Sequence, residues 1–181
     1  IKTINSNRHL TWQMAVNYVL ENKFTNVNLG NEQMAAVSSI AGYTQEQFEK
    51  LQEIYEYSKR RVKSSIPHIE DRTDDYTYET LRLDDPLGLA IGTLTDCCQE
   101  IDDAAEVCME HSMTSPDGRI FVIKDKEKNI VAQSWVWRNQ NVLCFDNIEI
   151  HHKAFERAIQ KKINLTQVVY DIYKQAANIL L

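Results

Sequence analysis

Three short apolar runs in a row constrain the fold of this chain more than any other feature. The runs are RIFVIKD (119–125), IVAQSWVWR (130–138) and VLCFDNIEI (142–150), and the polar turns KEKN and NQN join them. Strand-length apolar runs joined by polar turns this short predict an antiparallel meander. The C-terminal half of the chain should therefore be built on a sheet.

The segments around the meander add helices and one more strand. YTYETLRL (76–83) alternates and predicts a strand, PLGLAIGTLTDCCQEI (86–101) predicts a helix despite its glycines, and SPDG (115–118) predicts a turn. Asn164 and Gln167 then have the spacing of a capping box. The apolar positions that follow have helical spacing, so this helix should pack on the meander: Leu165, Val168, Val169, Ile172, Ala176 and Ile179.

The N-terminal third is predicted to be entirely helical. Helical spacing occurs over 8–21 and 31–41, and Gly42 fits the end of the second helix. Thr44 and Gln47 form a capping-box pattern that begins a third helix, which should reach about residue 63. The residues that share one face of this third helix are Phe48, Leu51, Tyr55, Ser58 and Val62.

A linker is predicted over 64–75, where a proline and a cluster of acidic residues interrupt the periodic patterns. The prediction is an α+β chain with a helical region at 1–65 and an α+β domain at 66–181.

Composition excludes several classes of protein. Hydrophobic residues make up 43% and charged residues 25%, which excludes a mainly disordered chain. No apolar run approaches the length of a membrane span, and the first residues lack a signal-peptide pattern. Four cysteines are too few for a disulfide scaffold, so we expect a reducing, cytoplasmic compartment. The absence of an initiator Met and the apolar helical pattern at the end predict a piece of a longer polypeptide.

The acidic charge is concentrated in the middle of the chain. Residues 66–119 contain three Lys or Arg and 14 Asp or Glu, a net charge of −11 within a chain of −6. Such charges are usually a solvated surface. The functional alternative is a mouth that attracts a cationic partner such as an amine.

Cys97, Cys98, Cys108 and His111 lie within 15 residues. Zinc would need four ligands, and adjacent cysteines on a helix diverge by about 100°, so both cannot easily bind one ion. A cysteine nucleophile would need a nearby base or helix N-terminus to lower its pKa, and His111 could serve, but nothing in the sequence orients it. We favour buried, hydrophobe-like thiols and expect no metal.

Asp146 and Glu149 are the candidate acid–base residues of the third run. Strand alternation places Asp146 on the same face of the sheet as Cys144, and Glu149 on the same face as Phe145. A carboxylate in a pocket has a raised pKa and can accept a proton from an amine, which makes Glu149 the candidate general base. The alternative is a polar residue at the end of a strand.

Two aromatic residues and one helix pair complete the candidates. Trp135 and Trp137 should share one face of the sheet, either as core or as a wall that contacts a ligand. The segment around Gly42 resembles a helix–turn–helix, but Glu46 and its neighbouring glutamates oppose binding to phosphates. Nucleic-acid binding is therefore not expected, and a docking module is favoured for 1–65.

From residue 76 onward the order of strand, helix, three-stranded meander and helix resembles the GNAT superfamily of acyltransferases. KNIVAQSW is similar to the G-x-I-V-A pattern often found in the second hairpin strand of that family. The block from TDCCQ to LCFDNIE is also similar to phage-encoded proteins of this type. The resemblance covers about 76–181.

What the resemblance implies is binding of acetyl-CoA. In the family, strand four splays from its neighbour and its backbone binds the pantetheine, here Asn147, Ile148 and Ile150. The diphosphate binds the N-terminus of the next helix, here Thr166, with Lys161 and Lys162 supplying charge. The glycine-rich phosphate loop of the family is absent between Ile150 and Thr166.

The expected function is an acyl-CoA-dependent N-acyltransferase acting on an amine, or a degenerate relative that keeps the shape. Glu149 would be the base and Asp146 a second acidic group. The alternative is a non-catalytic structural or interaction protein of phage origin, with a protein partner bound by the N-terminal helices. A nucleic-acid binder is the third interpretation.

Overall fold

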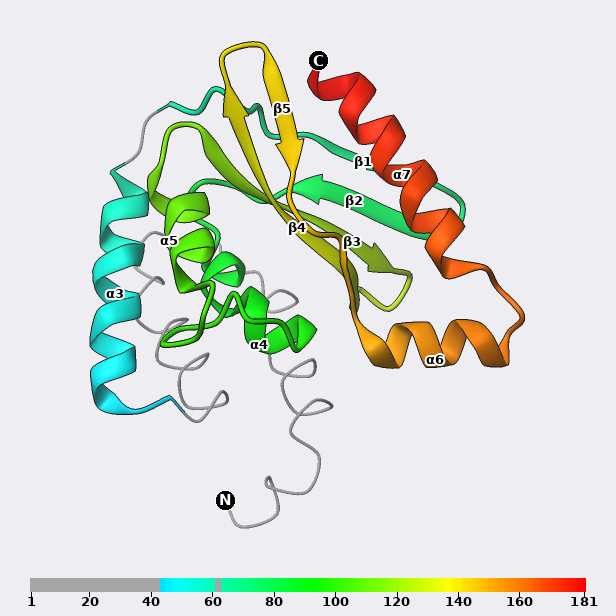
Figure 1. Cartoon of the computed structure of the whole chain (residues 1–181), viewed down its shortest axis with the longest axis horizontal. Coiled ribbons are helices and arrows are strands. Elements are labelled where there is room, and N and C mark those ends of the chain that lie inside the picture. The colour runs from blue at the N-terminus through cyan, green and yellow to red at the C-terminus, as the bar shows by residue number, and fades with distance from the viewer. Residues whose placement is uncertain (1–42, 61–62) are drawn as a thin grey trace.

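The computed structural model describes residues 43–60 and 63–181. It confirms an α+β protein built on a curled antiparallel sheet (Figure 1). The strand order is β1-β2-β3-β4-β5, and β6 also pairs with β4. The strands are β1 (Glu70–Arg72), β2 (Tyr76–Thr80), β3 (Gly118–Asp125), β4 (Ile130–Asn139), β5 (Val142–Phe145) and β6 (Glu149–Ile150).

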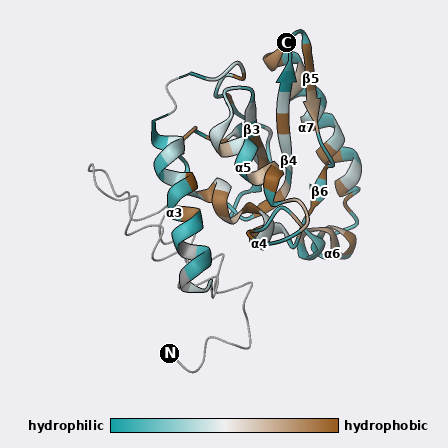
Figure 2. Ribbon diagram, turned by 60° about the vertical axis from the view of Figure 1, so that its left-hand side comes forward, coloured by the Kyte–Doolittle hydropathy of each residue, from teal (hydrophilic) through white to brown (hydrophobic). Residues whose placement is uncertain are grey.

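Helices cover both faces of this sheet. One face carries α6 (His152–Gln160) and α7 (Leu165–Leu180), and the other carries α3 (Gln45–Lys59), the 3₁₀ helix η2 (Pro86–Ala90), α4 (Ile91–Thr95) and α5 (Glu106–Thr114) (Figure 1). Because the central strands are covered on both sides, β3 is an almost continuous buried run rather than an alternating one. Figure 2 shows the hydrophilic residues gathered along α3 and the hydrophobic ones toward the sheet.

The α7 side holds the larger core cluster. Phe121 of β3 and Tyr173 of α7 stack edge to face, with ring centroids 4.8 Å apart. The buried face of α7 repeats at three- and four-residue spacing: Leu165, Val169, Ile172, Tyr173, Ala176 and Leu180. The predicted stripe included Ile179, which is instead 49% exposed. The cap is confirmed, since the Asn164 side chain accepts from the Gln167 N–H at 3.2 Å.

The other face is covered by α3 and by short helical segments. The Thr44–Gln47 capping box is confirmed, and Leu51 and Tyr55 pack with Leu89 of η2. The helix ends at Lys59, earlier than the predicted residue 63. The predicted helices at 8–21 and 31–41, and with them the first half of the helix–turn–helix pattern, lie outside the described residues.

The helix predicted over 86–101 is wrong beyond Thr95. Asp96 has a left-handed backbone (φ 54°), and the Cys97 N–H donates to the Gly92 carbonyl at 3.0 Å. This is the Schellman arrangement that ends a helix. An added Cβ on Gly92 would lie 2.4 Å from the Gln99 backbone, so the missing side chain lets the chain turn back at this point.

Three other elements differ from the sequence prediction. β1 forms inside the predicted linker by pairing with β2, and α5 and α6 occupy segments for which no helix was predicted. Only Ala154 and Ala158 of α6 are buried, whereas its larger apolar residues Phe155 and Ile159 are exposed. Among residues 43–60 and 63–181, no helix combines the length and the apolar character needed to cross a bilayer.

Candidate functional site

The last predicted strand is interrupted, and this break is the centre of the candidate site. Gln133 pairs with Glu149, and Val136 pairs with Phe145. Between these pairs β4 contributes two residues, whereas the opposite chain contributes three, 146–148. One extra residue on one strand is a β-bulge, a feature that bends a strand and often occurs beside active sites.

The bulge is held in a defined position from both sides. The Asp146 N–H donates to the Trp135 carbonyl at 2.8 Å, and the Ser134 hydroxyl donates to the Asn147 carbonyl at 3.0 Å. Within the described part of the chain, the main-chain N–H groups of Asn147 and Ile148 have no hydrogen-bond acceptor. Two unpaired N–H groups on a fixed bulge are potential donors to a ligand carbonyl.

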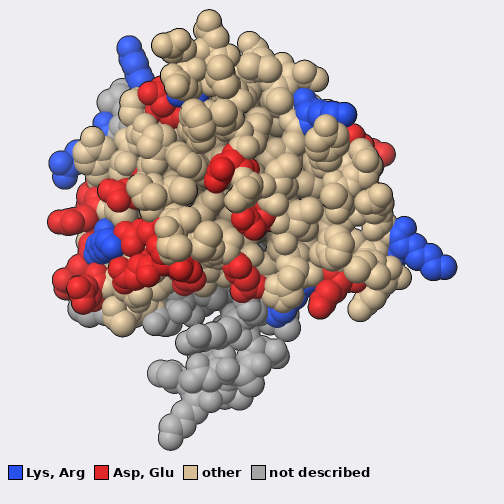
Figure 3. All heavy atoms as spheres, in the orientation of Figure 1, with Lys and Arg blue, Asp and Glu red and all other residues tan. Residues whose placement is uncertain are grey.

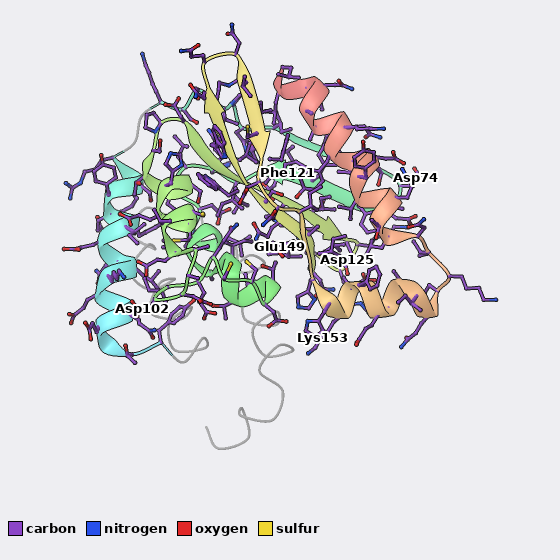
Figure 4. All side chains as sticks on the ribbon, in the orientation of Figure 1. Asp74, Asp102, Phe121, Asp125, Glu149 and Lys153 are labelled. Carbon is purple, nitrogen blue, oxygen red and sulfur yellow. The ribbon has the colours of Figure 1, made fainter. Side chains whose placement is uncertain are left out.

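Glu149 faces the side of the sheet that carries α4. Its cross-strand partner Gln133 is fully buried there and donates to the Cys97 thiol at 3.2 Å. Burial raises the pKa of Cys97, and the negative charge of Glu149 raises it further. Figure 4 shows Glu149 between the α4–α5 segment and the junction of β6 with α6. Glu149 is half-buried and is the first residue of β6, so both interpretations of this carboxylate stay open.

Asp146 lies on the same side and near a second cysteine. Burial raises the pKa of Cys108, and the charge of Asp146 adds to this effect. Thiols with raised pKa values stay protonated at neutral pH, which argues against either as a nucleophile. The sheet thus gathers Asp146, Glu149, Cys97 and Cys108, although these residues are up to 52 positions apart in the sequence.

The cysteines are less buried than predicted. All four are unpaired, Cys98 is exposed and the other three are half-buried. Cys97 and Cys98 follow the end of α4 instead of lying on a helix. His111 accepts a hydrogen bond at 3.2 Å from the Trp135 indole N–H, and Trp135 and Trp137 are half-buried neighbours with ring centroids 6.1 Å apart.

The predicted cofactor residues fall into two separate groups. Asn147, Ile148 and Ile150 lie at the bulge and in β6. Lys161, Lys162 and Thr166 are exposed residues beyond the far end of α6. The nine residues of α6 separate the groups by roughly 13 Å of helix. The helix that directly follows the strand is α6, so its first turn, with Lys153, takes the place that the sequence assigned to Thr166.

A third set of residues near the bulge was missed by the sequence analysis. Asp96, His151 and His152 place three potential metal-ligand atoms within 4.8 Å of one another. In the described ranges, no such metal-capable group contains a cysteine. The adjacent histidines were visible in the sequence, but Asp96 lies 55 residues before His151, so no spacing motif links them.

A separate acidic surface lies along α3 and is formed mainly by glutamates outside the acidic segment 66–119. A groove of about 1100 Å³ along α3 is lined by Glu46, Glu49, Glu53, Glu56 and Glu110 among others. Figure 3 shows acidic side chains crowded on the α3 side of the molecule. This groove contains neither Asp146 nor Glu149.

Comparison of the chain with protein-family models, with curated proteins and with solved structures finds no match. The function is therefore inferred from the geometry of the bulge and its surroundings.

Proposed function

We propose that this chain is an acyl-CoA-dependent N-acyltransferase acting on an amine, or a relative that keeps the shape of one. The observation that carries the proposal is the bulge at 146–148, which supplies unpaired N–H groups beside a half-buried carboxylate, Glu149. In the acyltransferases that the sequence resembles, the backbone of the family's fourth strand binds the cofactor. The segment of this chain that resembles that strand is 142–150, which contains the bulge. The sheet order and the helices on both faces fit the same family.

Acyl-CoA supplies an activated acyl thioester when bound. The N–H groups of Asn147 and Ile148 would donate to the acyl carbonyl oxygen, where negative charge develops as the amine attacks. Glu149 would accept the proton that the amine nitrogen loses. The new carbon–nitrogen bond replaces the carbon–sulfur bond, and the CoA thiolate leaves. Asp146, near Cys108, would attract the cationic acceptor.

The diphosphate of the cofactor fits the start of α6 better than the segment between α6 and α7. The first turn of α6 follows β6 directly, and the first turn of a helix presents N–H groups that have no partner within the helix, here together with Lys153. Lys161, Lys162 and Thr166 lie at the distant end of α6. The absence of glycine in this segment limits how closely the backbone can approach a phosphate, which favours a degenerate relative.

Thermal unfolding with and without acetyl-CoA tests the binding step. Ligand at 100 times its dissociation constant should stabilise the protein by about 2.7 kcal/mol. Lys153→Ala should reduce the shift, whereas the matched control Lys161→Ala/Lys162→Ala should keep it. If Lys161→Ala/Lys162→Ala reduced the shift and Lys153→Ala did not, the diphosphate would be assigned to the start of α7. No shift at millimolar ligand would contradict acyl-CoA-dependent activity.

Glu149→Gln tests the catalytic step separately from binding. The amide has nearly the shape of the carboxylate but cannot accept a proton, so the variant should keep the thermal shift and lose transfer of the acetyl group to amines. Transfer is measured by chromatography of CoA and acetyl-CoA. Full transfer by the variant would remove Glu149 as the base.

A protein-interaction function is the second candidate, and the surface of α6 and of the turn after it favours this function. Phe155, Ile159 and Ile163 are 42%, 61% and 40% exposed and follow one another at four-residue spacing. A failed acetyl-CoA test would leave this candidate and the predicted role of the N-terminal helices in place. Nucleic-acid binding is not proposed, because exposed glutamates line α3.

A further inference from the structure

Three side chains from two distant segments meet at the end of α4. Nδ1 of His152 lies 2.7 Å and Nε2 of His151 lies 3.8 Å from the same Asp96 oxygen, Oδ2. The imidazole rings of the two histidines lie 5.0 Å apart. Two imidazoles therefore converge on one carboxylate across a gap of 55 residues in the sequence.

The backbone at each ligand is fixed by the fold. The Asp96 turn is closed by the hydrogen bond from Cys97 to Gly92, and Asp is among the few residue types that accept its left-handed conformation. The His151 N–H donates to the Val131 carbonyl at 2.9 Å, which ties it to β4. His152 opens α6. Little rearrangement is needed to bring the three side chains to one ion.

The distances suit a small transition-metal ion. Ligand atoms about 2.0–2.1 Å from a metal ion lie about 3.0–3.4 Å from one another in common geometries. The two distances to Asp96, 2.7 and 3.8 Å, lie on either side of that range. Imidazole nitrogen is a ligand for zinc and other first-row transition ions, whereas calcium and magnesium prefer oxygen alone.

Exposure differs among the three ligands. The His151 side chain is 11% exposed, that of Asp96 35% and that of His152 53%. The group is therefore enclosed on the protein side and open on the other. Three protein ligands with an open side are typical of an exchangeable or catalytic metal site rather than of a closed structural one.

A second group with metal-ligand spacing, His68, Glu70 and Glu79, is less suited to a cation. Glu79 already forms an ion pair with Lys124, and the His68 imidazole bonds to the Thr80 carbonyl. A metal ion there would have to displace a lysine from its carboxylate. This group therefore serves as the internal comparison.

We propose that Asp96, His151 and His152 bind one divalent transition-metal ion, with Zn²⁺ the best match. The ion would join the end of α4 to the start of α6, near Glu149 and the bulge at 146–148. The proposal does not depend on acyl transfer, because it rests on these three ligands alone.

The test uses the full chain after removal of metal with a chelator. Co²⁺ is titrated by visible absorption and Zn²⁺ by calorimetry, and one ion per chain is expected. His152→Gln and Asp96→Asn should each weaken binding at least about tenfold, the scale seen for changes around metal ligands. His68→Gln and Glu149→Gln should bind as the unmodified chain does.

Zn²⁺ should also raise the melting temperature of the unmodified chain and of His68→Gln, but not of His152→Gln. His152 is half-exposed, so this variant keeps the fold even if Asp96→Asn does not, and circular dichroism of the metal-free proteins verifies that. The proposal is overturned if millimolar Zn²⁺ and Co²⁺ do not bind. It is also overturned if binding survives His152→Gln or is lost in His68→Gln. None of these outcomes changes the acetyl-CoA test.

Discussion

The hydroxyl of Tyr173 on α7 lies 2.9 Å from the hydroxyl of Ser134 on β4. Ser134 donates its own proton to the Asn147 carbonyl, so Tyr173 is the donor of this pair. A chain of two hydrogen bonds thus runs from the buried helix to the bulge. Burial raises the pKa of Tyr173, which keeps its hydroxyl protonated and able to donate.

Ser134→Ala should destabilise the protein by about 1–3 kcal/mol, because it leaves the buried Tyr173 hydroxyl without an acceptor. Tyr173→Phe removes the hydroxyl itself, so no buried donor is left without an acceptor. This variant should destabilise the protein by only about 0.5–1.5 kcal/mol. Urea unfolding measures both, and the double variant should cost less than the sum of the single ones. If the losses of unfolding free energy were additive, the two hydroxyl groups would not be energetically coupled.

Gly92→Ala should destabilise the protein by about 1–3 kcal/mol, because the added methyl group meets the Gln99 backbone at 2.4 Å. Gly88→Ala is the matched control. Its methyl group meets the Met113 sulfur at 2.3 Å, but a flexible side chain can move where a backbone cannot. Equal losses for the two variants in urea unfolding would contradict this explanation.

Arg119 is buried and joins two segments by donating to the carbonyls of Ile66 and Leu81, each at 2.6 Å. Burial lowers its pKa to about 10. Arg119→Met should leave both carbonyls without a donor, at about 1–3 kcal/mol for each. The exposed Arg82→Met should be nearly neutral. Thermal unfolding compares them, and a loss below 1 kcal/mol for Arg119→Met would show that water or another donor replaces the guanidinium.

Tyr43 should ionise late in the folded protein. Its hydroxyl lies 2.9 Å from that of Thr93, and burial raises the pKa of Tyr43 to about 12. The unfolded chain releases this proton first, near its ordinary pKa of about 10. This group's contribution to stability is therefore full below pH 10 and is lost as the pH rises toward about 12.

The difference in tyrosinate absorbance between the unmodified chain and Tyr43→Phe isolates this group. In the native protein the difference should titrate with a midpoint near 12, and in urea near 10. A native midpoint near 10 would mean that the Tyr43 hydroxyl is in contact with solvent.

Elements whose pattern is local could be predicted from the amino-acid sequence. The α+β class, the meander and the caps at Thr44 and Asn164 follow from alternation, turn composition and capping-box spacing, and the structure confirms them. Each of these signals lies within a few residues, where side-chain period and hydrogen bonding act directly. The function expected from the family resemblance stays a prediction.

Features that depend on residues far apart in the chain could not be predicted in this way, because they form only on folding. The extra residue at 146–148 becomes visible only from the pairing of that segment with β4, and the end of α4 at Asp96 depends on the close approach of Gly92 to Gln99. The meeting of Asp96 with His151 and His152 likewise requires the folded sheet. Sequence patterns report the faces of single elements, whereas a site is formed where packing brings separate elements together.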